Sequence, residues 1–118
     1  MKWIKVDCEI HRRREVKLLC KKMGVKPDHM VGTLVRFWAW ADGETENGML
    51  ESITRDIIDD EVGFDGFASA LEGVGWLLVA DDGCILPNFE KHNGQSAKRR
   101  ASDQRRKAHA RKQSNGKV

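Results

Sequence analysis

The segment TRDIIDDEVGFDGFASALEGVGWLLVADDGCIL, residues 54–86, determines the predicted fold of this 118-residue chain. Its first part predicts a helix of roughly two turns, because Thr54 is a suitable N-cap and Gly63 a suitable stop. Ile53 and Ile58 flank the start of this helix with the spacing of a hydrophobic staple. A second helix is expected almost immediately after Gly63.

The second helix and the residues that follow it complete the pattern. Phe67, Leu71 and Val74 recur at the spacing of one helix face. Residues 76–89 then predict two strands joined by a tight turn, in which Gly83 supplies the positive φ that such turns need. Two short helices separated by a glycine-containing turn and followed by a hairpin are typical of a winged helix-turn-helix. We therefore expect an α+β fold that is mainly helical with a small antiparallel sheet.

One strand and two helices are expected on the N-terminal side of this segment. Residues 2–6, KWIKV, alternate as in a short strand, which we expect to pair with the hairpin. An amphipathic helix ending at Gly24 follows. Its apolar stripe consists of Val16, Leu19, Cys20 and Met23. The next helix, opened by Pro27 and closed by Gly43, has apolar residues on more than one face and should be the central, most buried one.

The two tryptophans of this central helix raise the question of base stacking. Trp38 and Trp40 point in different directions on a helix, so they do not form one stacking platform. We expect Trp38 to belong to the core and Trp40 to pack under the hairpin or the opening strand.

Charge is distributed unevenly along the chain. The formal net charge of +3 divides into +6 for residues 1–26, −11 for residues 27–97 and +8 for residues 98–118. The middle would repel DNA phosphates, whereas both ends would attract them. Apolar periodicity stops near Phe89, which predicts a winged helix-turn-helix domain over residues 1–90 and a basic tail over residues 91–118. The tail is expected to be flexible in isolation, or helical on a polyanion.

The two basic ends supply the candidate DNA-binding residues. The segment SAKRRASDQRRKAHARK, residues 96–112, contains three basic clusters suited to following a phosphate backbone without reading bases. Its cations are Lys98, Arg99, Arg100, Arg105, Arg106, Lys107, Arg111 and Lys112. The first helix adds a second basic group, formed by Arg12, Arg13, Arg14, Lys17, Lys21 and Lys22. The alternatives are a solubilising tail and a solvated helix face that complements the acidic middle of the chain.

The helix that would ordinarily enter the major groove is acidic. It offers Asp65, Ser69 and Glu72, and it contains no Lys, Arg, Asn or Gln. Carboxylates placed against phosphates would be repulsive and would forfeit the free energy of counterion release. We therefore expect weak base readout, with this helix pair acting as a scaffold or as a protein-docking face.

No catalytic site is predicted. The chain lacks a phosphate-binding glycine loop, an H-E-x-x-H motif and a recognisable nucleophile. The paired aspartates at 59/60 and 81/82 are adjacent in sequence, and we interpret them as solvent-facing groups on a helix and in a turn.

A metal site and a membrane span are not predicted either. Cys8 and His11 are spaced as one ligand pair, but Cys20 and Cys84 are too far apart in sequence to form the second. Three cysteines at unrelated spacings fit a reducing compartment, and no apolar run has membrane-spanning length. We expect a cytoplasmic protein without a cofactor.

Four stretches carry a resemblance to a known family. They are KWIKVD (2–7), VGTLVRFWAWAD (31–42), GFASALEGVGWL (66–77) and PNFEKHNGQSAKRRA (87–101). Together the chain resembles N-terminal winged-helix domains of phage and prophage replication proteins, of the replisome-organiser or replication-initiator kind. The resemblance implies a bacterial or phage protein that binds DNA at or near an origin. It also implies a second region that contacts a helicase or its loader, so this chain is either naturally short or a fragment.

These observations lead to one main hypothesis and two alternatives. The main hypothesis is a non-catalytic DNA-binding module of a phage-type replication initiation protein, held on single- or double-stranded DNA by its tail and first helix. The first alternative is an adaptor or oligomerisation domain whose acidic face docks a helicase loader or another copy of the chain. The second is a small transcriptional regulator, which would require sequence-specific binding.

Overall fold

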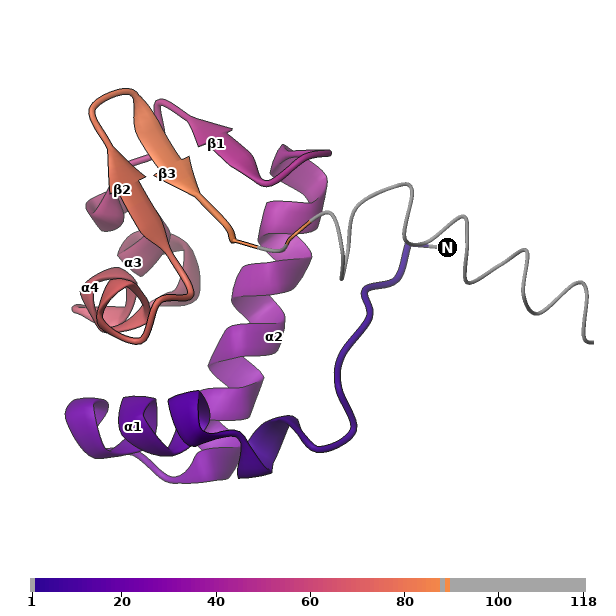
Figure 1. Ribbon diagram of the computed structural model, residues 1–118, viewed down its shortest axis with the longest axis vertical. Helices are drawn as coiled ribbons and strands as arrows, with labels where there is room; N and C mark the ends of the chain where they lie inside the picture. Colours follow the sequence, from indigo (N-terminus) through magenta and orange to yellow (C-terminus); the bar gives the residue numbers. More distant parts are fainter. Residues whose placement is uncertain (1, 88, 90–118) are drawn as a thin grey trace, which may run out of the picture.

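The computed structural model describes residues 2–87 and 89, which form an α+β fold that is mainly helical (Figure 1). This confirms the prediction of a mainly helical α+β fold with a small antiparallel sheet, whereas the predicted tail lies outside the described residues. In chain order the elements are η1 (Ile10–Arg12), α1 (Arg14–Met23), α2 (Pro27–Glu44), β1 (Met49–Glu51), α3 (Arg55–Val62), α4 (Phe67–Gly73), β2 (Leu78–Ala80) and β3 (Gly83–Ile85). None of the described helices is both long and apolar enough to cross a bilayer.

The predicted helix ends agree closely with the structure. The Thr54 hydroxyl oxygen accepts a hydrogen bond from the backbone N–H of Ile57 at 3.3 Å, and Pro27 occupies the first turn of α2. Gly24 and Gly63 both adopt the left-handed conformation that ends a helix, with φ of 68°. The exception is α2, which continues past Gly43 to Glu44.

The prediction of a strand at residues 2–6 is wrong. The third strand is β1, which pairs antiparallel with β3, while β3 also pairs with β2. A hydrogen bond beside β1 supports this pairing. The Leu86 N–H, which follows β3, donates to the Gly48 carbonyl, which precedes β1, at 2.8 Å. Leu50 is then buried from β1 at 1% exposure, whereas Ile4 is only half-buried. Burial therefore favours residues 49–51 over the N-terminal segment as the partner of β3.

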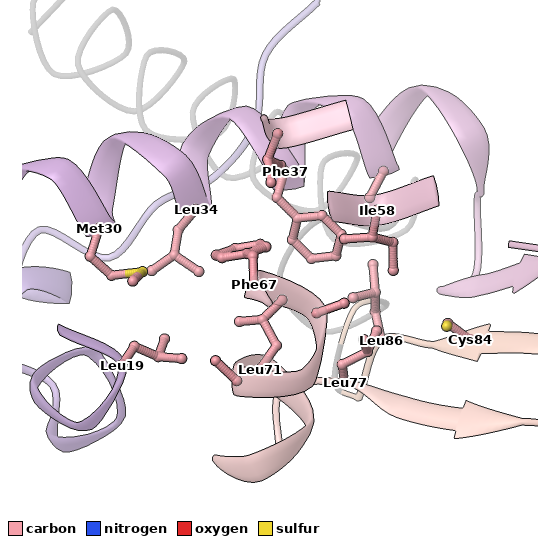
Figure 2. Packing of buried hydrophobic residues seen from close by; sticks show 14 of the residues in the cluster. Leu19, Met30, Leu34, Phe37, Ile58, Phe67, Leu71, Leu77, Cys84 and Leu86 are labelled. Carbon is pink, nitrogen blue, oxygen red and sulfur yellow. The ribbon is translucent and has the colours of Figure 1, made fainter. Parts of the chain in front are cut away.

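One face of α2 forms the centre of the core. Its buried residues are Met30, Thr33, Leu34, Phe37 and Ala41. Phe37 meets Phe67 of α4 edge to face, with ring centroids 5.7 Å apart (Figure 2). The α1 helix packs against α2 and α4, and in Figure 1 it lies at the end of α2 opposite the sheet.

The turn between α3 and α4 is held by the carboxylate of Asp59. Its two oxygens accept hydrogen bonds from the backbone N–H groups of Gly66 at 2.9 Å and Ala68 at 2.8 Å. These N–H groups lie at the start of α4 and have no partner inside that helix. The interpretation of both members of the Asp59-Asp60 pair as simply solvent-facing is therefore wrong for Asp59, although Asp60 is exposed.

Substitution of Asp59 tests this capping role. In Asp59→Ala, two N–H groups lose their acceptor, and we expect the free energy of unfolding to fall by about 1–3 kcal/mol. Asp60→Ala is the matched control, because it removes the same charge from the same helix and should change stability by less than about 0.5 kcal/mol. Urea unfolding of the two variants measures the difference, and equal stabilities would show that the Asp59 contacts contribute nothing.

Two glycines provide a second test of the fold. At Gly83, where φ is 150°, an added Cβ would collide with the Leu50 carbonyl oxygen of the neighbouring strand. Gly83→Ala should therefore lower the free energy of unfolding by about 2 kcal/mol or more. Gly32 lies in the middle of α2 with nothing near its missing Cβ, so Gly32→Ala should raise stability by about 0.5–1 kcal/mol. Thermal or urea unfolding measures both changes. If the two substitutions changed the free energy of unfolding in the same direction, the described packing would be contradicted.

Candidate nucleic-acid interface

Five of the six cations predicted on the first helix separate into two groups. Arg12 lies in η1, and its Nε is 3.4 Å from a Glu9 carboxylate oxygen. Arg13 precedes α1 and lies 3.7 Å from Asp7 and 3.8 Å from Glu15. These arginine side chains are at least half exposed, so the pairs contribute little stability and leave the guanidinium groups able to exchange partners.

The second group forms one stripe along α1. Arg14, Lys17 and Lys21 are spaced so that they lie on the same side of the helix, and all three are exposed. Among the described residues, no carboxylate lies within ion-pair distance of these three side chains. We call Arg14, Lys17 and Lys21 the α1 stripe. Leu18, which is 44% exposed, lies beside it.

Lys22 belongs to neither group. A Cβ added at Gly73 would lie 2.7 Å from the Lys22 Nζ, which places this ammonium at the C-terminal end of α4. A cation is favourable there, because the carbonyl groups of a helix C-terminus carry partial negative charge. Lys22 is exposed and lies where α1 meets the end of α4.

The tail cations lie outside the described residues. These are Lys98, Arg99, Arg100, Arg105, Arg106, Lys107, Arg111 and Lys112. The predicted DNA-binding residues within the described part of the chain are Arg12, Arg13, Arg14, Lys17 and Lys21.

The surface of α3 and α4 offers no unpaired cation to a phosphate. Asp65, in the turn before α4, and Ser69 are exposed, and Glu72 is engaged by the guanidinium of Arg55 from α3. The Arg55 Nε and Nη2 donate to the two Glu72 carboxylate oxygens at 3.0 and 3.2 Å, which is a bidentate pair. Because this pair uses the cation of α3, the helix pair presents a surface on which only carboxylates are unpaired.

The acidic groups also extend to the hairpin. The exposed acids of α3, of the turn before α4 and of the hairpin tip are Asp56, Asp60, Glu61, Asp65, Asp81 and Asp82. The β2–β3 turn and α1 lie at opposite ends of the fold (Figure 1). The acids of the hairpin tip are therefore separated in space from the cations of α1, whereas α4 packs against α1.

A cavity of about 420 Å³ lies between the N-terminal segment and the chain that follows β3. Its aromatic lining comes from Trp38 of α2, Trp76 before β2, and Phe89. The indoles of Trp38 and Trp76 are in contact, with centroids 6.0 Å apart and planes inclined by 45°. Lys5, Asp7 and Arg13 add charged groups. Trp38 is thus half-buried at a cavity rather than enclosed in the core.

Sequence reasoning missed this cavity because its walls come from four separate segments. The Trp38–Trp76 pair could not be found by spacing along one element, since the residues belong to α2 and to the α4–β2 connection. Trp40, the other tryptophan of α2, does not line the cavity and lies beside Phe37, with ring centroids 6.2 Å apart. The prediction that the two tryptophans of α2 do not form one platform therefore agrees with the structure.

No metal centre is formed by the described residues, among which no three His, Cys, Asp or Glu side chains cluster. Cys8 is exposed, whereas Cys20 and Cys84 are buried. Burial raises the pKa of the Cys20 thiol. Burial also raises the pKa of Cys84, with Arg55 lowering it and Glu72 raising it by smaller amounts. A raised pKa reduces the thiolate fraction at any given pH, so both thiols should be unreactive.

Comparisons of the chain with protein-family models, with curated proteins and with solved structures give no match.

Thiol reactivity tests these assignments. With a disulfide reagent near pH 8, we expect one fast-reacting thiol per native chain, Cys8, and three in denaturant. Cys8→Ser should remove the fast phase and serves as its control. Rapid reaction of two or three thiols in the native protein would contradict the burial of Cys20 and Cys84.

Proposed function

We propose that the packed domain is a winged helix-turn-helix. Three features support this proposal. The helices α3 and α4 are joined by a short turn that contains Gly63 and Gly66, the β2–β3 hairpin follows them directly, and β1, which precedes them, joins the hairpin in a sheet of order β1-β3-β2. In this arrangement α4 corresponds to the groove-facing helix and the β2–β3 hairpin to the wing.

We further propose that the protein is a non-catalytic DNA-binding module that holds the phosphate backbone through the α1 stripe and the basic tail. The observation that carries this proposal is the separation of charge on the described surface. Among the described residues no carboxylate pairs with the exposed Arg14, Lys17 and Lys21, whereas the turn before α4 exposes Asp65 and the hairpin tip exposes Asp81 and Asp82. Phosphates would be attracted to the first surface and repelled by the second.

The resemblance to phage and prophage replication proteins gives this binding a context. On that basis the module belongs to a phage-type replication initiation protein and brings DNA near a helicase or its loader. The acidic helix pair then remains free to contact protein while α1 and the tail contact DNA. Backbone contacts from α1 and the tail predict weak sequence preference and strong salt dependence.

Salt-dependent DNA binding tests this proposal. If about six tail cations contact duplex phosphates, log affinity should fall with log salt at a slope near −5 from the tail alone. The α1 stripe adds to this slope, so Lys17→Gln combined with Lys21→Gln should reduce the magnitude of the full chain's slope by about 2. Fluorescence anisotropy of the full chain with labelled duplex at several salt concentrations measures both quantities.

The matched control changes two cations outside the α1 stripe. Lys26→Gln combined with Arg36→Gln makes the same change in net charge on exposed positions of the α2 segment, and it should leave the slope nearly unchanged. Equal effects of the two double variants would mean that net charge, and not the α1 stripe, governs binding. Removal of residues 95–118 should abolish most of the affinity, and retention of affinity would contradict the role of the tail.

A second candidate function is an adaptor or oligomerisation domain. The observation that favours it is an apolar row across the outer face of the sheet, where Met49 and Leu78 both pair with Ile85. Met49 is 46% and Leu78 is 52% exposed. The row lies at the end of the paired strands away from the acidic turn, Asp81 and Asp82, so a basic partner with apolar side chains, or the tail of another copy, would contact both along the hairpin.

Light scattering after size-exclusion chromatography separates the two functions. A tail-dependent oligomer that forms without DNA and dissociates in high salt would favour the adaptor function. A monomer that binds duplex DNA favours the proposed function. High affinity for one duplex sequence that survives loss of the tail would instead indicate a transcriptional regulator.

A further inference from the structure

We propose that the cavity between the N-terminal segment and Phe89 binds an unstacked nucleobase of single-stranded DNA, with a flanking phosphate at Arg13. This inference rests on the proposed DNA-binding function and extends it. It assigns a ligand to the cavity and a strandedness to the DNA, because a base paired in a duplex could not enter. Three properties of the cavity support it: its aromatic lining, the cations at its edge and its continuity with the α1 stripe.

The lining suits a flat aromatic ring. Trp38 and Trp76, both half-buried, contribute two indole rings, and Val6, Leu86 and the buried Phe89 also line the cavity. A volume of about 420 Å³ lies within the range of small-ligand sites. Because the two indoles already touch, a base would lie against the cavity side of the Trp38–Trp76 pair and not between its members. Stacking of this kind tolerates any base, since every base has a π-face.

The edge of the cavity provides for a phosphate. Lys5 and Arg13 both line it, with Asp7 as the opposing charge. Arg13 is 51% exposed on its side chain, and its contacts with Asp7 and Glu15 are 3.7 and 3.8 Å long. These distances exceed those of hydrogen bonds, so the guanidinium could exchange them for a phosphate at small cost. Asp7 already accepts a hydrogen bond from the Glu9 N–H at 2.9 Å, which directs one of its oxygens to the backbone.

The cavity also continues the α1 stripe. Arg13 lines the cavity, and the stripe begins at the next residue, Arg14, and extends to Lys21. Arg14 and Lys21 are seven positions apart, which corresponds to about 10 Å along the helix axis, a length comparable to the spacing of a few phosphates. A strand held by the stripe would therefore present its next nucleotide to Arg13 and its base to the indole pair.

An abasic oligonucleotide separates the base from the phosphates. Anisotropy titrations of the full chain should compare a short single-stranded oligonucleotide, an abasic one of the same length and charge, and a duplex. We expect the base-containing strand to bind more tightly than the abasic one. Trp38→Leu should weaken binding of the base-containing strand by about 5- to 150-fold while leaving the abasic strand and the duplex unaffected.

Trp40→Leu is the matched control, because it makes the same change on the same helix at a position that does not line the cavity. It should leave all three affinities unchanged. Equal binding of the base-containing and abasic strands to the native protein would overturn the cavity assignment even if Trp38→Leu failed to fold. Binding of the duplex in that case would leave the proposed function standing, whereas no binding of any DNA would overturn both.

Discussion

The edge-to-face contact between Phe37 and Phe67, with centroids 5.7 Å apart, joins the long α2 helix to α4 at the centre of the core (Figure 2). The two residues are fully buried, and the other packed elements depend on the face of α2 that they occupy. The α1 helix covers one end of this face, and the sheet lies toward the other (Figure 1). Because aromatic pairs and close packing tolerate little displacement, this contact holds α4 in place on α2.

The distribution of charge follows from this arrangement. The α1 stripe lies at one end of the fold, and the acidic hairpin tip lies at the other. Asp59 and Arg55 link the acidic helices internally, the first by capping α4 and the second by pairing with Glu72. The carboxylates that remain unpaired face solvent on the helix pair. In the proposed function, α1 and the tail bind DNA, and α4 is left for a protein or for no ligand.

Local signals allowed much of the fold to be predicted from the sequence. Caps such as Thr54, Pro27 and Gly63 depend on a few neighbouring residues, so their patterns were sufficient to place the helices. The third strand was misplaced because KWIKV and the residues around Leu50 are both short, and only tertiary burial distinguishes them. The Asp59 contacts and the Trp38–Trp76 pair were missed for a related reason. Each joins residues that the chain brings together only after it has folded.

Amide chemical shifts of the full chain during titration with duplex DNA would locate the bound phosphates directly. We predict that perturbations concentrate in η1 and α1, around Arg14, Lys17 and Lys21, and in the tail cations, while α4 and the β2–β3 turn change little. Perturbations centred on Ser69 and Asp81 would mean that the acidic helix and hairpin meet DNA after all, and would contradict the proposed binding surface.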